Sequence, residues 1–168
     1  MPKLFVTDRE GAEERLRSHP PVALVSCHNP GANPCEGFEG FSGPKISFNF
    51  ADSAPGDRFE GEAAATVEQV KTLLEWGQTH KNLNGEVLVH CNAGVGRSPA
   101  VAFALQALWD DFSASENKSL ALALVGCTTG PMPNEHIVSL ADNLLGREGR
   151  MLFSVKVFND SISGTLMY

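Results

Sequence analysis

Short apolar runs occur along the chain, and their residue types are typical of buried strands. Four such runs, rich in β-branched and aliphatic residues, lie at residues 4–6, 22–27, 45–50 and 87–89. Between the last two, residues 62–80 carry apolar side chains at the three- and four-residue spacing of a helix that packs on a sheet. A strand, a helix and a strand in this order form a right-handed crossover, so we expect neighbouring strands to be parallel.

Capping residues and glycines indicate further helices around these strands. Asp8 and Asn134 are candidate N-caps, and Ser98 followed by Pro99 is typical of a helix start. The expected helices span residues 9–17, 98–110, 115–125 and 135–145. Residues 149–168 fit either a helix or an edge strand, and both alternatives stay open. The whole chain, residues 1–168, is therefore predicted to form one α/β domain with a central, mostly parallel sheet flanked by helices.

Composition and charge narrow the classes of partner. The chain has 168 residues, 42% of them hydrophobic, which is enough for one domain with its own core. Its net charge of -7 argues against nucleic acid or an anionic membrane as a partner, because both need a basic face. The four cysteines lack paired spacing, which predicts neither a zinc site nor a disulfide framework and favours a reducing compartment. The N-terminal apolar run is too short for a signal peptide, so we expect a cytoplasmic protein.

The fourth apolar run ends in a glycine-rich loop that opens directly into a predicted helix. Gly94 and Gly96 follow Cys91 by three and five residues, and backbone without a Cβ can curl there so that successive N–H groups point inward. The N-terminus of the following helix adds the positive end of its dipole. This pattern predicts a phosphate site at the carboxyl end of a strand. The residues of this predicted site, which we call the anion loop, are Asn92, Ala93, Gly94, Val95 and Gly96.

Cys91 and Arg97 give this region a specific chemistry. Inward N–H groups and a nearby guanidinium stabilise a cysteine thiolate, which is the nucleophilic form of the residue. Arg97 can place its planar fork on two oxygens of a phosphoryl group, which the ammonium of a lysine cannot do. None of Cys27, Cys35 and Cys127 has an arginine six residues later, so the pairing is particular to Cys91.

The loop sequence resembles the signature of cysteine-dependent protein tyrosine and dual-specificity phosphatases, in which His-Cys, five variable residues, Arg and Ser or Thr follow one another. The matching residues are His90-Cys91-Asn92-Ala93-Gly94-Val95-Gly96-Arg97-Ser98. Residues 133–151 are similar to the C-terminal helices of small bacterial proteins of this type. The resemblance implies the cysteine-phosphatase fold and hydrolysis of phosphomonoesters through a cysteinyl phosphate on Cys91. It implies no metal and no organic cofactor.

A general acid is the next requirement, because the leaving oxygen of a phosphomonoester needs a proton. In the resembled family this acid is an aspartate on a loop before the helix that precedes the nucleophile strand. Asp52 fits that position best, since it follows a predicted strand, and Asp57 is the second candidate. Either aspartate could instead be an ordinary turn residue beside Pro55 and Gly56.

Three residues are candidates for supporting the site. His90 at a strand end favours a neutral ring that bonds to nearby backbone and holds the loop in shape. Ser98 can donate its hydroxyl to a thiolate on Cys91, cap the helix, or do both. In related phosphatases a Pro-Asn pair lies near the loop, so Asn134 is a candidate brace, although helix capping is the role that we favour.

Two further features keep alternatives open. Cys27 is expected to be an inert core residue, with a reversible disulfide to Cys91 as the other interpretation. Residues 28–43 contain several glycines and prolines and form either a rim of the site or a surface excursion.

The expected partner is a phosphorylated protein or a small phosphomonoester, with inorganic phosphate or another oxyanion in the pocket. Classical tyrosine-specific enzymes use a tyrosine to flank the phosphotyrosine ring and a late glutamine to position water. Here Tyr168 is the only tyrosine and no glutamine follows Gln106, so the resemblance favours a compact dual-specificity type. The anion loop carries no charged side chain, which disfavours polyanionic substrates. A phosphate-recognising binding module with negligible hydrolysis is the main alternative. A sulfur-transfer or arsenate-reducing enzyme is a weaker one.

Overall fold

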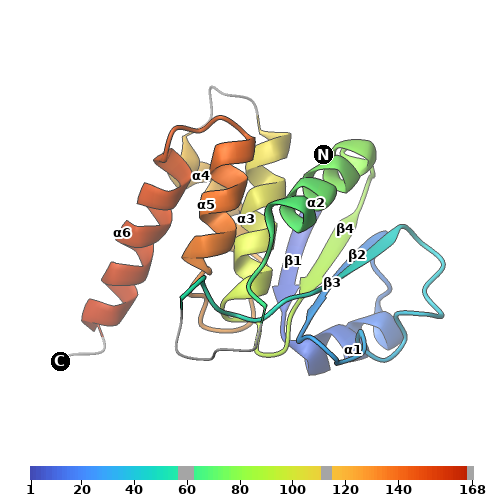
Figure 1. The fold of residues 1–168 in the computed structure, drawn as a ribbon. Helices are drawn as coiled ribbons and strands as arrows, with labels where there is room; N and C mark the ends of the chain where they lie inside the picture. Colours follow the sequence, from blue (N-terminus) through green and yellow to red (C-terminus); the bar gives the residue numbers. More distant parts are fainter. Residues whose placement is uncertain (57–62, 111–114, 166–168) are drawn as a thin grey trace.

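The computed structural model describes residues 1–56, 63–110 and 115–165, and within these ranges four strands form one parallel sheet (Figure 1). The strands lie side by side in the order β1-β4-β2-β3. Their bounds are Lys3–Thr7 for β1, Ala23–His28 for β2, Lys45–Asn49 for β3 and Glu86–His90 for β4. All four predicted strands are confirmed, and every pairing between them is parallel.

Six helices surround the sheet in the same described ranges. Their bounds are Arg9–Ser18 for α1, Val67–His80 for α2, Arg97–Trp109 for α3, Glu116–Leu124 for α4, Glu135–Leu144 for α5 and Arg150–Thr165 for α6. The ambiguous tail is thus a helix through residue 165. The start of α2 was predicted too early, at residue 62, which lies outside the described ranges; Thr66 and Gln69 form a capping box that begins the helix.

Helices cover both faces of the sheet. Figure 1 shows α2 to α6 gathered on one side of it and α1 on the other. Val89 and Phe103 are fully buried in the larger core, beneath α2 to α6. Leu24 and Leu88 point the other way, into a smaller cluster under Ala12 of α1. Because successive strand residues face opposite sides, coverage of both faces explains why the strands are apolar without alternation.

The start of α3 differs from the prediction. The sequence predicted Ser98 as the N-cap, but the helix begins at Arg97, with Gly96 at the N-cap position and no side-chain capping bond. The anion loop closes so tightly that its last glycine already occupies the cap position, which leaves Ser98 inside the first turn. Its hydroxyl contacts the sulfur of Cys91 instead. The helix ends at Trp109 with Asp110 as its C-cap, close to the predicted end.

All four strands are parallel, so their carboxyl ends meet at one edge of the sheet. The anion loop follows β4, which lies between β1 and β2, so it emerges near the middle of that edge. Parallel α/β sheets bind ligands at this place because the loops there can converge. Among the helices of the described ranges, none is both long and apolar enough to cross a membrane.

Candidate active site

The anion loop curls around the sulfur of Cys91. Gly94 has a φ of +71°, a conformation that residues with a Cβ adopt only with strain, and its N–H donates to Cys91 Sγ at 3.2 Å. A Cβ on Gly94 would lie 2.8 Å from the backbone nitrogen of Asp8 and 2.9 Å from the carbonyl carbon of Thr7. The loop is therefore both tightly curled and packed against the end of β1.

The sulfur itself is enclosed by hydrogen-bonding groups. Cys91 is 1% exposed, and Ser98 Oγ lies 3.1 Å from its Sγ. The Ser98 hydroxyl and the Gly94 N–H thus converge on the same atom. Hydrogen bonds of this kind can stabilise negative charge that develops on the sulfur during a reaction, because bonds to a charged acceptor are stronger.

The outer side of the anion loop is held by the segment that follows α4. The bonds run from Thr129 Oγ1 to Gly94 O at 2.7 Å, from Met132 N to Val95 O at 2.7 Å, and from Asn134 N to Gly96 O at 3.0 Å. These three consecutive carbonyls point outward, and in a trans peptide the N–H of the next residue points the opposite way. The N–H groups of residues 95–97 therefore face the inside of the loop, where an anion would bind.

Arg97 lies under the loop and is 4% exposed. Its Nη1 donates to Asn29 Oδ1 at 2.7 Å and to the carbonyl oxygen of Phe50 at 2.8 Å. Its Nε is buried and has no hydrogen-bond partner within the described residues. Both hydrogens of Nη1 are therefore in use, whereas the edge formed by Nε and Nη2 has a donor free for an oxyanion.

Asp52 and Asn134 meet beside the anion loop. A Cβ on Gly96 would collide with the carboxylate of Asp52, so only glycine allows this approach. Asn134 Nδ2 donates to Asp52 Oδ1 at 2.8 Å, while Asn134 Oδ1 accepts from Ile137 N at 3.0 Å. Asn134 therefore caps α5, as predicted, and the same side chain bonds to Asp52 beside the anion loop. Asp57, the second candidate acid, lies outside the described residues.

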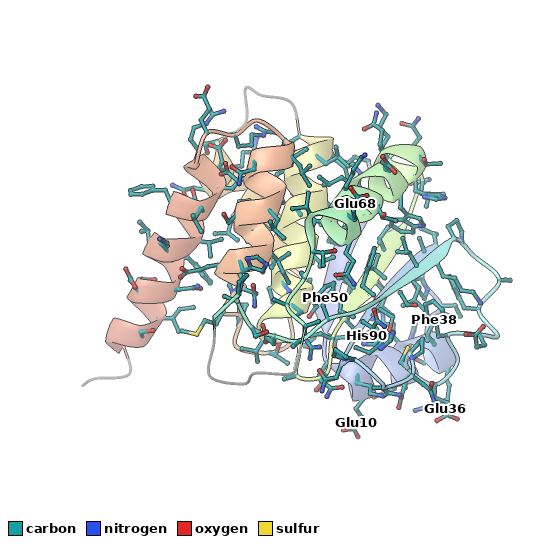
Figure 2. All side chains as sticks on the ribbon, in the orientation of Figure 1. Glu10, Glu36, Phe38, Phe50, Glu68 and His90 are labelled. Atoms are coloured by element: carbon teal, nitrogen blue, oxygen red, sulfur yellow. The ribbon has the colours of Figure 1, made fainter. Side chains whose placement is uncertain are left out.

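His90 is the last residue of β4 and is 1% exposed. Burial lowers the pKa of its imidazole to about 4, although the bond with the Cys91 carbonyl opposes that shift. Nδ1 lies 3.3 Å from that carbonyl oxygen, as expected for a ring that holds the loop in shape. Figure 2 shows His90 and Phe50 at the same end of the sheet. At neutral pH the ring is therefore uncharged.

Cys27 lies next to the nucleophile candidate. Ser26 is paired with His90 in the register of β2 and β4, so the following residues, Cys27 and Cys91, adjoin at the strand ends. Burial, followed by the neighbouring Cys91, raises the pKa of the Cys27 thiol far above its usual range. Both sulfurs are free thiols in this structure.

The structure also reveals residues that the sequence did not single out. Asn29 and the carbonyl of Phe50 contact Arg97, and Thr129 and Met132 hold the loop from outside. Asn29 lies in the segment 28–43, for which a rim role was one of two expectations, so the bond to Arg97 supports that interpretation at this residue. Within the described residues, no three His, Cys, Asp or Glu side chains gather in a way that could hold a metal.

The parallel sheet and the helices around it have the fold of solved dual-specificity phosphatases. Human DUSP28 superposes with a TM-score of 0.58 at 17% identity, covering 88% of this chain and 94% of that one. The human tyrosine phosphatase-like serine/threonine/tyrosine-interacting protein gives 0.58 at 19% identity, with the same coverage of 88% and 94%. A mouse putative dual specificity phosphatase, complexed with zinc tungstate, gives 0.56 at 16% identity and covers 87% of this chain and 84% of its own. No protein-family model and no curated protein matches the chain.

Proposed function

We propose that this protein is a phosphomonoester hydrolase that acts on phosphotyrosine, with phosphoserine and phosphothreonine as further substrates, through a cysteinyl phosphate. One observation carries the proposal: a buried sulfur in contact with the Gly94 N–H and the Ser98 hydroxyl, and a buried guanidinium with a free edge, lie at the two ends of one curled loop. The free thiols suit a reducing compartment, and we expect the cytoplasm.

In the first step, the thiolate of Cys91 attacks phosphorus and the bond from phosphorus to the leaving oxygen breaks. Arg97 and the inward N–H groups of the anion loop bind the non-bridging oxygens and stabilise the charge that they carry in the transition state. Asp52 enters the step as a carboxylic acid and gives its proton to the leaving oxygen. Its exposed position beside Gly96 suits a group that must meet a substrate from outside.

In the second step, water attacks the cysteinyl phosphate and Asp52, now a carboxylate, accepts a proton from that water. The bond from sulfur to phosphorus breaks, phosphate leaves and the thiolate of Cys91 returns. Ser98 donates to the sulfur as negative charge develops on it, which makes the thiolate a better leaving group. No step requires a metal or an organic cofactor.

Hydrolysis of p-nitrophenyl phosphate tests the proposal. Cys91→Ser is expected to abolish turnover, and Arg97→Ala to lower kcat/KM on the order of 10²- to 10³-fold because transition-state charge loses its main partner. Cys35→Ser is a matched control, since this cysteine is buried in the small cluster under α1. Activity that persists in Cys91→Ser would disprove the proposal, and EDTA is expected to change nothing.

The general acid is tested separately through the pH profile. Asp52→Asn is expected to flatten the bell-shaped dependence of the rate on pH, because the group that supplies the leaving-group proton is gone. Asp57→Asn is the matched control. Loss of activity in Asp57→Asn with an unchanged Asp52→Asn would reassign the acid to Asp57.

A phosphate-recognising binding module is the second candidate function. The observation that favours it is the enclosure of Cys91, which is 1% exposed, because an oxyanion can bind to the loop N–H groups without being attacked. Tungstate binding by a wild-type protein that releases no phosphate from p-nitrophenyl phosphate would select this alternative.

A further inference from the structure

Arg97 forms a hydrogen bond with a residue 68 positions away in the chain. Asn29 follows the end of β2, and its Oδ1 lies 2.7 Å from Arg97 Nη1. The second acceptor on the same nitrogen, the carbonyl of Phe50, lies just beyond β3 at 2.8 Å. Two strand ends thus hold one nitrogen of the guanidinium from two directions. A planar group held in this way cannot rotate about its long axis.

We propose that Asn29 is a positioning residue that turns the Nε and Nη2 edge of Arg97 towards a bound oxyanion. This role rests on the proposed binding of phosphate by Arg97. With Nη1 occupied by Asn29 and Phe50, the remaining fork can offer two parallel N–H bonds to one phosphoryl group. The buried Nε, which lacks a hydrogen-bond partner within the described residues, lies on that edge.

The chemistry of the amide suits this position. Every guanidinium hydrogen is a donor, so the side chain of Asn29 must present its oxygen to Arg97. An amide oxygen is an uncharged acceptor, and it fixes the guanidinium without cancelling its charge. A carboxylate at the same place would hold the group equally well but would offset its attraction for a phosphate dianion. Substitutions at this position can therefore separate the effect of orienting Arg97 from the effect of its charge.

The surrounding segment does not need the Asn29 side chain to stay in place. Arg9 donates from Nη1 to Asn33 O at 3.0 Å and from Nη2 to Pro34 O at 2.9 Å, which ties the segment to α1. The backbone before Asn29 is held as well, because Phe50 N donates to His28 O at 3.1 Å. Loss of the amide is therefore expected to free the guanidinium rather than to unfold the loop.

The test compares Asn29→Ala and Asn29→Asp with Asn33→Ala, an exposed asparagine of the same segment. The readouts are kcat and KM for p-nitrophenyl phosphate and the Kd for tungstate, measured calorimetrically. Asn29→Ala is expected to lower kcat and to weaken tungstate binding, each about tenfold or more, as for loss of a hydrogen bond to a charged group. Asn29→Asp is expected to recover most of kcat while tungstate binding stays weaker than in the wild type. A purely structural role of Asn29 would not recover kcat while leaving tungstate binding weaker.

The outcomes separate this role from the proposed hydrolysis. A wild type that binds tungstate without turnover would refute the hydrolase, yet weaker tungstate binding by Asn29→Ala would still support the positioning role. An active wild type, with Asn29→Ala within twofold of Asn33→Ala in both readouts, would overturn the role of Asn29 alone. Failure of the wild type to bind tungstate would overturn both. If Asn29→Ala does not fold, Asn29→Asp provides the test. A kcat far below that of the wild type, or a Kd for tungstate equal to that of the wild type, would then contradict the proposal.

Discussion

His90 ends β4 directly before Cys91, and its surroundings disfavour a positive charge there. Burial lowers the pKa of the ring to about 4 from the ordinary value of 6.5, while Nδ1 lies against the Cys91 carbonyl. Arg9 and His28 push the pKa down and Glu13 pushes it up, so the groups on α1 and β2 that face this ring partly offset one another. The neutral ring contacts the backbone at the start of the anion loop without adding a charge there.

This shift makes folding stability depend on pH. The unfolded chain takes up a proton on this histidine near pH 6.5 and the folded chain only near pH 4. The stability that the neutral ring contributes is therefore complete above pH 6.5 and is lost as the pH falls towards 4. Between about pH 7 and about pH 5 we expect a loss of about 2 kcal/mol in the free energy of unfolding. Urea unfolding of the wild type and of His90→Gln checks this.

His90→Gln is expected to lose much less stability over the same pH interval, because glutamine does not titrate. The control is His19→Gln, since His19 is exposed and its replacement should leave the wild-type pH dependence intact. Parallel curves for the wild type and His90→Gln would contradict the assignment of this dependence to His90.

Single residues also show how far the sequence could predict the site. Cys91 and Arg97 could be found because the loop that joins them is local, and its glycines and the helix-start residues are visible in nine consecutive residues, 91–99. Asn29 and Thr129 could not be found, because the bond of Asn29 to Arg97 spans 68 residues and that of Thr129 to the anion loop spans 35. Their residue types are common in turns, so only the folded arrangement separates them from other turn residues.

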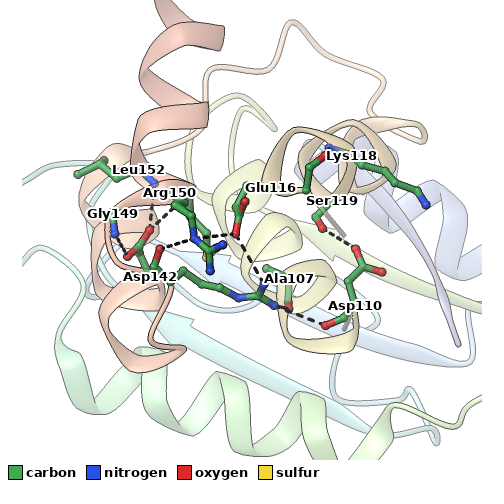
Figure 3. Close-up of polar contacts among 12 residues, drawn as sticks. Ala107, Asp110, Glu116, Lys118, Ser119, Asp142, Gly149, Arg150 and Leu152 are labelled. Carbon is green, nitrogen blue, oxygen red and sulfur yellow. Dashed lines mark hydrogen bonds and ion pairs between the residues drawn. The ribbon is translucent and has the colours of Figure 1, made fainter. Parts of the chain in front are cut away.

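Among the elements, α5 and α6 are joined by a buried carboxylate. Asp142 lies on α5 and is 2% exposed; its oxygens accept from Gly149 N at 2.6 Å, Met151 N at 2.7 Å and Leu152 N at 3.3 Å (Figure 3). The first turn of every helix has N–H groups without partners inside the helix, and here one side chain from a neighbouring helix satisfies them. The negative charge also favours the positive end of the α6 dipole.

Asp142→Ala is expected to lower the free energy of unfolding by about 3 kcal/mol, because buried N–H groups at the start of α6 lose their acceptor. Asp142→Asn keeps one acceptor oxygen and is expected to fall between this variant and the wild type. The matched control is Asp160→Ala, which removes an exposed aspartate of α6. Urea unfolding provides the measurement. Equal stability of Asp142→Ala and Asp160→Ala would contradict the capping role.

The elements differ in how well their sequence predicted them. All four strands were found to within one or two residues, since a sheet covered on both faces requires continuous apolar runs. The tail was ambiguous because 149–168 has no local signal that decides between a helix and a strand. Its helix is fixed by distant partners: Met151 and Val155 are fully buried against the core, and Asp142 caps its start. The start of α3 was predicted one residue too late, because Ser98, a residue type typical of N-caps, contacts the sulfur of Cys91 instead of capping the helix.

At the scale of the whole molecule, the site gathers segments from most of the chain. Elements that follow β1, β2, β3 and β4 all contact the loop or Arg97, and the segment before α5 closes it from outside. The net charge of -7 repels a dianion at long range, so the proposed binding of phosphate depends on short-range donors: Arg97 and the inward N–H groups. We therefore expect ligand binding and global stability to be coupled, because unfolding any of these segments dismantles the proposed site.

This coupling predicts a thermal shift. Tungstate at about 100 times its Kd stabilises a protein that binds it only when folded by about 2.7 kcal/mol, which for a chain of this size corresponds to a rise in Tm of about 5 to 10 °C. Cys91→Ser is expected to keep most of the shift, because the loop N–H groups and Arg97 remain, whereas Arg97→Ala is expected to lose most of it. Sodium chloride at matched ionic strength controls for screening of the negative surface, which also relieves repulsion within the folded chain. A shift of equal size with chloride, or one that survives in Arg97→Ala, would mean that the anion acts on the molecule's overall charge and not at the loop.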